Sequence, residues 1–545
     1  MGARLPDPGA LQLPALRPAD RLAQGPDGPR IPGHRPARPA GQPDLVPAGR
    51  HLALHLAPDP GRRLGGDHHR SALRLGAPEA RRRRHLPGRQ AGGAECDGRC
   101  HRAGPRAGGA VPAARRLRRR GVGVSDPDLL VIGAGAAGIA AARAARAAGR
   151  AVRVLEARDR PGGRAWTESA TLGAPFDLGA TWLHQAGDNP LTPLARDAFD
   201  HDAVRSHRCL IGGRPAGAAE MAEYDAAYAA FHDRLRAARA TAAPDAAVAD
   251  HAPRGGFWDA TVAHWEGPVI CAAPLAAMDL RDFLDTQLAG PNLLLRDGIG
   301  GLLAGLAAEL PVTYGAPVER LSWSGPGVVA EGPFGRIAAR AAIVTAPTAV
   351  LAAGAIRFDP PLPAETEQAI HDLPLGLLSK IGLRAAGEDR LDLAPFAGLE
   401  RRVEAEDEAA MTFIAWPFGC DHVMGFLGGE AAWALAREGA AGLADHARAE
   451  LRRAYGGRAA AALRFDRPLA SDWGRDPWAR GAYSHARPGR AAARAALARP
   501  LGGGRLRFAG EACHPRLAAT VAGAWESGHI AAWAALQPED VRFKP

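Results

Sequence analysis

The first 124 residues of this 545-residue chain contain no phenylalanine, tryptophan, tyrosine, lysine, asparagine or threonine, and only one isoleucine, Ile31. The same stretch holds 17 of the 46 prolines. A segment with so few large apolar side chains does not offset the entropy that folding removes. We therefore expect residues 1–123 to be a disordered leader, or to be absent from the native protein because translation starts near Val122 or Val124.

Acidic residues are also scarce in this leader. It carries 24 arginines against 9 aspartates and glutamates, a net charge of +15, whereas the whole chain carries +10. Residues 125–545 therefore hold 44 basic and 49 acidic groups and have a net charge of −5. A basic arm can bind RNA or acidic surfaces, but no nucleic-acid partner is expected for a folded body that is mildly acidic.

Three further absences exclude whole classes of protein. No apolar run reaches the ~18 residues of a membrane span, and the N-terminal 30 residues lack the basic and apolar regions of a secretory signal. The six cysteines are scattered and form no disulfide framework. No cysteine–histidine cluster has zinc spacing, so no metal is expected. We expect a cytoplasmic protein; the sequence does not indicate its oligomeric state.

Lysine is almost missing from the whole chain. Of 68 lysine and arginine residues, only Lys380 and Lys544 are lysines. Lys380 lies within residues 377–383, LLSKIGL, which is typical of a buried strand. An ammonium is compact and its pKa can shift, unlike that of a guanidinium, and a buried one is costly without a partner. Lys380 is therefore a candidate functional residue; the alternative is a strand-edge lysine that reaches solvent.

From Ser125 onward the composition and the pattern of apolar residues are typical of a folded domain. Residues 129–132 form a short apolar run that predicts a buried parallel strand. A glycine-rich turn follows, then an alanine- and arginine-rich helix over 139–148. A second strand over 151–155 ends at Glu156. Strand, turn, helix, strand and acid make a complete βαβ unit.

The turn in this unit has the pattern of a dinucleotide-binding site. Gly133 permits the tight turn, Gly135 lets backbone approach a pyrophosphate, and Gly138 lets the helix pack closely on the sheet. The helix N-terminus offers free N–H groups to the phosphates, and Glu156 stands where a carboxylate accepts from ribose hydroxyls. The alternative is a glycine-rich turn that serves helix packing alone.

A second glycine turn follows the acid at once. Gly162, Gly163 and Arg164 lie six to eight residues after Glu156. They indicate another backbone approach to the same cofactor, with Arg164 forming a charge-assisted bond to the pyrophosphate. The alternative is an ordinary surface turn with a solvated arginine.

These motifs and several later ones resemble the flavin amine oxidases, that is, the monoamine oxidases, polyamine oxidases and their relatives. The resemblance extends over most of residues 126–535 and is weakest in the middle. It is carried by FDLGATWLHQAGDNPL at 176–191, VTAP at 344–347, IRFDPPLP at 356–363, GLLSKIGL at 376–383, DWGRDPWARGAYSHARPG at 472–489 and RFAGEACHPRLAATVAGAWESGHIAAWAAL at 507–536.

The resemblance implies an α/β fold: a Rossmann-like FAD-binding domain with a parallel sheet and helices, plus an α+β substrate-binding domain formed from insertions. We assign 124–190, 296–345 and 476–540 to the FAD-binding domain and 191–295 and 346–475 to the substrate-binding domain.

The residue pattern predicts elements within these domains as well. It predicts mainly helix over 191–290, a helix over 298–310, short strands over 312–345, helices over 364–373 and 430–455, a last core strand over 506–509 and a terminal helix over 521–535.

The resemblance also implies functional residues. Lys380 corresponds to a lysine that bridges through water to flavin N5, Tyr483 to an aromatic wall, and His184 to a residue of the substrate tunnel; the alternative for His184 is a core histidine bonded to backbone. These three are the predicted catalytic residues. The predicted cofactor-binding residues are Gly133, Gly135, Ala136, Ala137, Gly138, Glu156, Ala157, Gly162, Gly163, Arg164, Gly179, Ala180, Thr181, Trp182, Val318, Trp473, Gly510, Glu511, Thr520 and Val521.

At some positions the chain differs from the family that it resembles. Ala482 stands where monoamine oxidases attach flavin through a cysteine, so we expect non-covalent FAD. Thr520 stands where monoamine oxidases have a second tyrosine, which is the pattern of polyamine oxidases, although that branch usually has glycine where this chain has Ala519.

The function implied is FAD-dependent oxidation of an amine, polyamine-like or monoamine, with O2 as acceptor. Hydride passes from the amine α-carbon to flavin N5, giving an imine or aldehyde and H2O2. Three alternatives stay open: an L-amino-acid oxidase or flavin-dependent desaturase on the same fold, a catalytically silent flavoprotein scaffold, and a nucleic-acid-binding protein that uses the basic leader.

Overall fold

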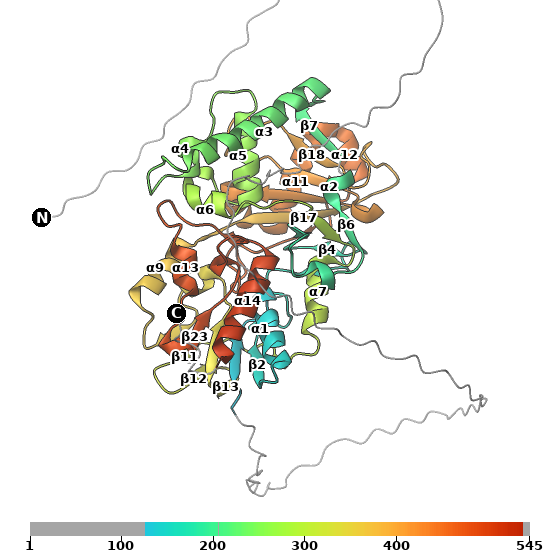
Figure 1. Cartoon of the computed structure of the whole chain (residues 1–545). Helices are drawn as coiled ribbons and strands as arrows, with labels where there is room; N and C mark the ends of the chain where they lie inside the picture. Colours follow the sequence, from blue (N-terminus) through green and yellow to red (C-terminus); the bar gives the residue numbers. More distant parts are fainter. Residues whose placement is uncertain (1–125, 205, 538–545) are drawn as a thin grey trace, which may run out of the picture. The chain divides into compact units, whose positions relative to one another are not determined.

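The computed structural model describes residues 126–204 and 206–537 (Figure 1). The predicted leader, residues 1–123, lies outside the described residues, as do Lys544 and the last residues of the predicted FAD-binding domain.

A five-stranded parallel sheet forms the centre of the βαβ region. The strand at 129–132 is flanked on one side by the strand that follows the first helix and on the other by two strands from far along the sequence. Leu129, Leu130 and Val131 are fully buried because both faces of the sheet are covered. In spatial order the strands are β10 (Val312–Thr313), β2 (Val152–Leu155), β1 (Leu129–Ile132), β14 (Ala341–Val344) and β23 (Leu506–Phe508).

Two helices pack along each other beside this sheet. Helices α1 (Ala136–Ala147) and α14 (Val521–Leu536) lie side by side next to β2 and β23 in Figure 1. They approach closely because α14 carries Gly528, where a Cβ would stand 2.0 Å from the carbonyl oxygen of Ala137. Helix α7 (Gly298–Ala307) packs on α1 as well.

A four-stranded sheet is built from residues 320–359, on both sides of β14 in the sequence. Its strands are β13 (Gly335–Ala339), β12 (Val328–Gly332), β11 (Arg320–Ser322) and β15 (Arg357–Asp359). This confirms the prediction of short strands over 312–345. Helix α8 (Thr348–Ala352) lies between β14 and β15, and helices α9 (Ala364–Asp372) and α13 (Ala493–Ala498) come after β15 in the sequence.

A seven-stranded mixed sheet carries the predicted lysine strand. Its order is β21 (Leu469–Ala470), β17 (Leu378–Arg384), β20 (His422–Gly428), β19 (Thr412–Ala415), β18 (Gly398–Arg401), β7 (His207–Ile211) and β8 (Arg214–Pro215). Helices α10 (Gly429–Ala436), α11 (Gly439–Tyr455) and α12 (Gly457–Ala462) follow β20 in the sequence.

The segment predicted as mainly helical is more mixed than expected. It contains α2 (His201–Val204), α3 (Ala218–Ala238), α4 (Val248–His251), α5 (Asp259–His264), the π-helical turn η2 (Trp265–Cys271) and α6 (Leu280–Asp285). It also supplies β7 and β8 to the mixed sheet. Three small sheets complete the fold: β16 (Leu375–Gly376) with β22 (Tyr483–Ser484), β3 (Thr167–Glu168) with β4 (Phe176–Asp177), and β5 (Trp182–Leu183) with β9 (Leu293–Leu295) and β6 (Ala198–Asp200).

A parallel sheet covered by helices, joined by further mixed sheets and helices, confirms the predicted fold class. The exact domain boundaries stay a prediction. Within residues 126–204 and 206–537, no helix combines the length and the apolar character that crossing a bilayer requires.

Candidate functional site

A cavity of about 310 Å³ opens at the carboxyl ends of the parallel strands. Its wall includes Ile132 at the end of β1, Leu155 at the end of β2 and Thr345 just after β14. Ligands of open α/β sheets bind at this edge. The same cavity continues to β17, η2 and β22, so strands of the mixed sheet and a helical turn also contribute to its wall.

The first glycine turn, which contains Gly133 and Gly135, forms part of the cavity wall. Gly133 has a φ of +106°, a conformation that favours glycine, and the chain then enters α1 within three residues. No side chain caps the N-terminus of α1, so its first N–H groups remain available to an anion. Gly135 and Gly162 form an isolated β-bridge, which brings the second glycine turn beside the first.

Glu156 is buried at the end of β2 and is held by backbone N–H groups. Its Oε2 accepts from the N–H of Ala134 at 2.6 Å and its Oε1 from that of Arg158 at 2.9 Å. Arg158 in turn pairs with Asp476 at 2.7 Å. Each carboxylate oxygen has a further lone pair, and Glu156 lines the cavity, as its predicted role requires.

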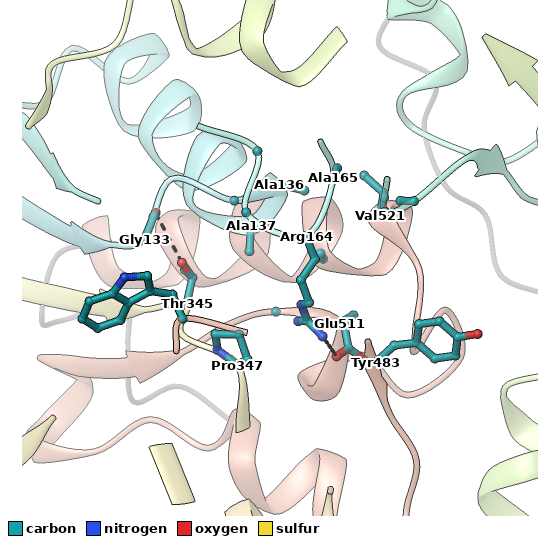
Figure 2. A pocket seen from close by; sticks show the side chains of 18 of the residues that line it. Gly133, Ala136, Ala137, Arg164, Ala165, Thr345, Pro347, Tyr483, Glu511 and Val521 are labelled. Carbon is teal, nitrogen blue, oxygen red and sulfur yellow. Dashed lines mark hydrogen bonds and ion pairs between the residues drawn. The ribbon is translucent and has the colours of Figure 1, made fainter. Parts of the chain in front are cut away.

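Arg164 is not a solvated surface residue. Its Nη1 donates to Oε1 of Glu511 at 3.0 Å and to the carbonyl oxygen of Ala482 at 2.8 Å; Figure 2 shows the Arg164–Glu511 pair. Ser484 and the N–H of Ala519 also donate to Glu511. Burial raises the pKa of Glu511, but Arg164 and Arg494 outweigh it, so the pKa is lower than usual.

The N-terminus of α14 faces the cavity from another side. Val521, its first residue, lines the cavity, and Figure 2 shows it beside the α14 ribbon. Thr520 is the N-cap: its Oγ1 accepts from the N–H of Gly523 at 2.9 Å and donates to the carbonyl oxygen of Leu517 at 2.7 Å. Thr520, which stands where monoamine oxidases have a second tyrosine, therefore caps helix α14.

Thr520→Ala is expected to lower the free energy of unfolding by about 1 kcal/mol, because the substitution removes this N-cap. Thr520→Ser keeps the capping oxygen and is expected to retain most of the stability. Chemical denaturation of the apoproteins measures both. Equal stability of the alanine and serine variants would show that the hydroxyl contributes nothing to the start of α14.

Lys380 lies inside the protein, so the alternative of a solvent-reaching lysine is wrong. It is 4% exposed, and its Nζ donates to Oγ1 of Thr181 and to the carbonyl oxygens of Gly179 and Asp177. The ammonium also lies 5.7 Å from the ring centre of Trp182. Burial lowers the pKa of Lys380 to about 8, although the nearby Asp177 opposes this shift.

Tyr483 and His184 both line the cavity, and each is fixed by one hydrogen bond. The hydroxyl of Tyr483 donates to the carbonyl oxygen of Ile270 at 2.8 Å, which ties the ring to the π-helical turn η2. Nδ1 of His184 lies 2.7 Å from Oδ1 of Asn292, so this ring bonds a side chain and not backbone. Burial lowers the pKa of His184 and raises that of Tyr483.

The structure brings the predicted residues together with one exception. Gly138 does not line the cavity but packs against the turn, where a Cβ would stand 1.8 Å from the carbonyl oxygen of Gly133. The residues at the cavity wall are Gly133, Gly135, Ala136, Ala137, Glu156, Ala157, Gly162, Gly163, Arg164, Gly179, Ala180, Thr181, Trp182, His184, Val318, Lys380, Trp473, Tyr483, Gly510, Glu511, Thr520 and Val521.

Several wall residues were not predicted. Thr345 and Pro347, both visible in Figure 2, follow β14 at the same sheet edge as Gly133. The VTAP motif and the rule that ligands bind at strand carboxyl ends could have identified them. Ile270 and Leu288 come from the middle segment, where no local pattern in the sequence marks a site.

These observations fit an FAD molecule. The glycine turns leave backbone exposed for a diphosphate, the uncapped start of α1 supplies N–H groups, and Glu156 stands at the end of β2 for a ribose. In the part of the chain that the structure describes, no group of histidine, cysteine or acidic side chains is placed to hold a metal ion. Fold and site together are typical of a dinucleotide-binding α/β protein.

Comparison with known families identifies the protein more closely. The family described as flavin containing amine oxidoreductase matches residues 136–536. The chain belongs to this family of flavin-dependent oxidoreductases. The predicted family is thereby confirmed.

Curated relatives are similar over most of the chain. "Lysine-specific histone demethylase 1 homolog 1" of Arabidopsis thaliana is 27% identical, and the match covers 74% of this chain and 52% of the relative. "Lysine-specific histone demethylase 2" of Homo sapiens is 26% identical, with 73% and 52% covered. The chain thus spans about half the length of these curated relatives.

Solved structures share the fold. A cyclohexylamine oxidase from Brevibacterium oxydans IH-35A has a TM-score of 0.61 at 21% identity, with 75% of this chain and 98% of that chain covered. A putrescine oxidase bound to putrescine has a TM-score of 0.56 at 22% identity, with 75% and 98% covered.

Proposed function

We propose that this protein is an FAD-dependent oxidase of small amines. The overall reaction converts an amine, O2 and water to an aldehyde or ketone, the released amine or ammonia, and hydrogen peroxide. One observation carries this proposal: a single cavity is lined both by the dinucleotide turn around Gly133 and by Lys380, Tyr483 and His184. Bound FAD supplies the flavin ring that accepts a hydride from the carbon next to the amine nitrogen.

The apolar part of the wall prepares the amine. Val269, Ile270 and Leu288 line the cavity. An amine that binds against these apolar side chains loses hydration, which lowers the pKa of its ammonium form and favours the neutral nitrogen. The neutral form has the lone pair that assists loss of hydride from the adjacent carbon. The ring of Tyr483, held through Ile270, supplies an aromatic face for the amine.

Lys380 moves or holds a proton beside the reacting atoms. A pKa near 8 allows its Nζ to exist in both protonation states close to neutral pH. The bonds to Gly179 and Thr181 fix the position of Nζ. In the proposed role, Lys380 holds a water molecule or a proton where oxygen is reduced or the imine is hydrolysed.

We also propose that the FAD is not covalently attached. Ala482 offers no nucleophilic side chain, and its carbonyl oxygen is occupied by Arg164. Among the described residues that line the cavity, none is a cysteine. Release of yellow flavin on acid precipitation supports this proposal, and flavin that stays with the pellet contradicts it.

We favour small free amines over histone-tail lysines as substrates, because the chain matches the two kinds of relative over different shares of their length. This chain spans about half the length of the demethylases, yet it matches 98% of the cyclohexylamine and putrescine oxidase chains. An N-methylated lysine presents the same type of C–N bond, so it belongs in the test as a competing substrate.

The test is an amine panel on FAD-loaded protein. Cyclohexylamine, putrescine, spermidine, spermine and a peptide with N-methyl-lysine are added without oxygen while flavin bleaching is followed, and with oxygen while peroxide is measured. We expect bleaching and peroxide with at least one free amine. Turnover of L-amino acids alone would establish the amino-acid oxidase alternative, and no bleaching with any substrate would favour the scaffold.

A further inference from the structure

Glu511 lies at the centre of a buried network of hydrogen bonds. It is the first residue of the short helical turn η6 (Glu511–Cys513), which follows β23. Its Oε1 accepts from Nη1 of Arg164 at 3.0 Å and from the backbone N–H of Ser484 at 3.3 Å. Its Oε2 accepts from Oγ of Ser484 at 2.7 Å and from the backbone N–H of Ala519 at 3.0 Å. Because two donors point at each oxygen, the network requires the ionised form of Glu511.

A second buried pair of charges lies behind Ser484. Nη1 of Arg494 donates to Oγ of Ser484 at 2.9 Å. The same guanidinium forms a bidentate ion pair with Asp282, at 2.6 Å from Nε and 2.8 Å from Nη2. Arg494 lies in α13 and Asp282 in α6, and both side chains are buried. Among the described residues that line the cavity, none belongs to α6, so this helix reaches the cavity only through the network.

The two charged neighbours fix the direction of the hydroxyl of Ser484. A guanidinium only donates, so Oγ of Ser484 must accept from Arg494. The hydroxyl hydrogen then points at Glu511, whose ionised oxygen accepts it. The bidentate contact with Asp282 holds the plane of the guanidinium. A relay of fixed direction therefore runs from α6 to the carboxylate of Glu511.

Arg164 is the end of this relay that faces the cavity. Both hydrogens of its Nη1 are used, one by Glu511 and the other by the carbonyl oxygen of Ala482. Within residues 126–204 and 206–537, no hydrogen-bond partner is found for its Nε or Nη2, and Arg164 lines the cavity (Figure 2). One edge of the guanidinium therefore keeps its N–H groups for an anion.

We propose that Asp282, Arg494 and Ser484 are positioning residues for the cofactor. Through Glu511 they hold the free edge of Arg164 toward the cavity, where the diphosphate of FAD binds. The proposal rests on the FAD of the proposed function and not on the identity of the amine. It makes α6, a helix outside the cavity wall, a contributor to FAD affinity.

Charge balance explains why the protein tolerates this network inside. The guanidiniums of Arg164 and Arg494 face the carboxylates of Glu511 and Asp282, so the buried charges sum to zero. Burial raises the pKa of Glu511, but the two guanidiniums outweigh it and keep the pKa below its usual value. Removal of one charge leaves a buried partner unpaired, which is strongly destabilising. The variants that test the relay therefore leave the charges balanced.

The first test removes only the hydroxyl, in Ser484→Ala. Fluorescence titration of the apoprotein with FAD measures the affinity, which we expect to be about tenfold weaker, the effect of losing one hydrogen bond to a charged group. The same substitution is then made in Arg164→Lys, which keeps a charge beside Glu511 but lacks the free guanidinium edge. There we expect Ser484→Ala to change the affinity less than about twofold, because its effect passes through Arg164.

The second test removes the ion pair behind the hydroxyl. Asp282→Asn/Arg494→Gln leaves no buried charge without a partner, so the fold is expected to persist, whereas the hydroxyl of Ser484 loses its fixed direction. We expect about the same tenfold loss of FAD affinity, again suppressed in Arg164→Lys. The matched control is Arg499→Gln at the end of the same helix, where the arginine and its partner are exposed. We expect it to change the affinity less than about twofold.

The outcomes separate the relay from a structural effect and from the proposed function. Wild-type affinity in Ser484→Ala, or an equal loss of affinity with Arg164 and with Arg164→Lys, would overturn the relay. Apoprotein that binds no FAD would overturn the relay together with the proposed cofactor. The expected affinities in a protein that oxidises no amine would leave the relay standing and reject the proposed function.

Discussion

Gly138→Val is expected to abolish FAD binding and to destabilise the fold. A Cβ at this position would stand 1.8 Å from the carbonyl oxygen and 2.9 Å from the carbonyl carbon of Gly133, and 3.2 Å from a methyl group of Val131. The first two atoms are backbone of the turn and cannot rotate away. Helix α1 therefore has to move away from β1, and the backbone conformation of the turn that lines the cavity has to change.

The movement of α1 is opposed on its other side. Gly528 of α14 already touches the backbone of Ala137, so α1 has little space in which to shift. We expect a loss of about 3 kcal/mol or more in the free energy of unfolding, at the upper end of the cost of overpacking a core. We expect an FAD affinity at least ~100-fold weaker, since the N–H groups at the start of α1 no longer face the diphosphate.

Denaturation of apoprotein and fluorescence titration with FAD measure the two effects. Gly301→Ala is the matched control, because Gly301 lies inside α7 and a Cβ added there would meet only open space. Alanine there is expected to stabilise by about 0.5–1 kcal/mol without changing FAD affinity. Wild-type affinity in Gly138→Val would show that the turn at the start of α1 is not the diphosphate site.

The cavity wall around the first glycine turn was predictable because its signals are local. Gly133, Gly135 and Glu156 lie within one βαβ unit, so their spacing predicts that they meet at one cavity wall, as the structure has them. The apolar flanks of Lys380 likewise predict the buried strand that the structure contains as β17. Both predictions depend on residues that are close in sequence.

The mixed sheet was less predictable, and the reason is burial. All residues of β20 and of β19 are buried, so neither strand shows the alternation of apolar and polar residues that marks a half-exposed strand. Short, fully buried runs of this kind are ambiguous between helix and strand. The pairing of β7 with β18, from segments about 190 residues apart, depends on tertiary structure as well.

The rest of the cavity wall depends on contacts between distant segments. Ile270 enters the cavity wall from a π-helical turn that contains Pro268, a conformation that no simple periodicity predicts. The pair of Arg164 with Glu511 joins residues 347 positions apart. A resemblance can nominate such residues singly, but it does not show that they contact one another.

Lys380→Met is expected to slow oxygen-dependent turnover by about 100-fold or more, the usual contribution of a positioned acid–base group. FAD binding and folding are expected to persist, since methionine fills a similar volume among Trp182 and Phe426. Stopped-flow absorbance separates flavin reduction by the amine from reoxidation by O2, and we expect the larger effect on reoxidation. Lys380→Arg keeps a charge but cannot lose its proton, so it is not expected to restore the rate.

The same variant gives a test that needs no substrate, through the pH dependence of stability. The pKa of Lys380 falls from 10.5 to about 8 on folding, so between these values the unfolded chain binds more protons than the folded one. Stability therefore rises with pH across this window and is lowest below it, where a charged lysine is buried. The shift spans about 2.5 pH units at about 1.4 kcal/mol each, or between about 3 and 4 kcal/mol.

Lys380→Met lacks this titration, so its apoprotein is the reference. We expect the free energy of unfolding of wild type, relative to the variant, to rise by up to ~4 kcal/mol between pH 8 and 10.5. Other groups that titrate in this range are common to both proteins and cancel in the difference. A difference that stays constant with pH would show that Lys380 keeps an ordinary pKa in the folded protein, and its proposed role as a proton-holding group near neutral pH would then fail.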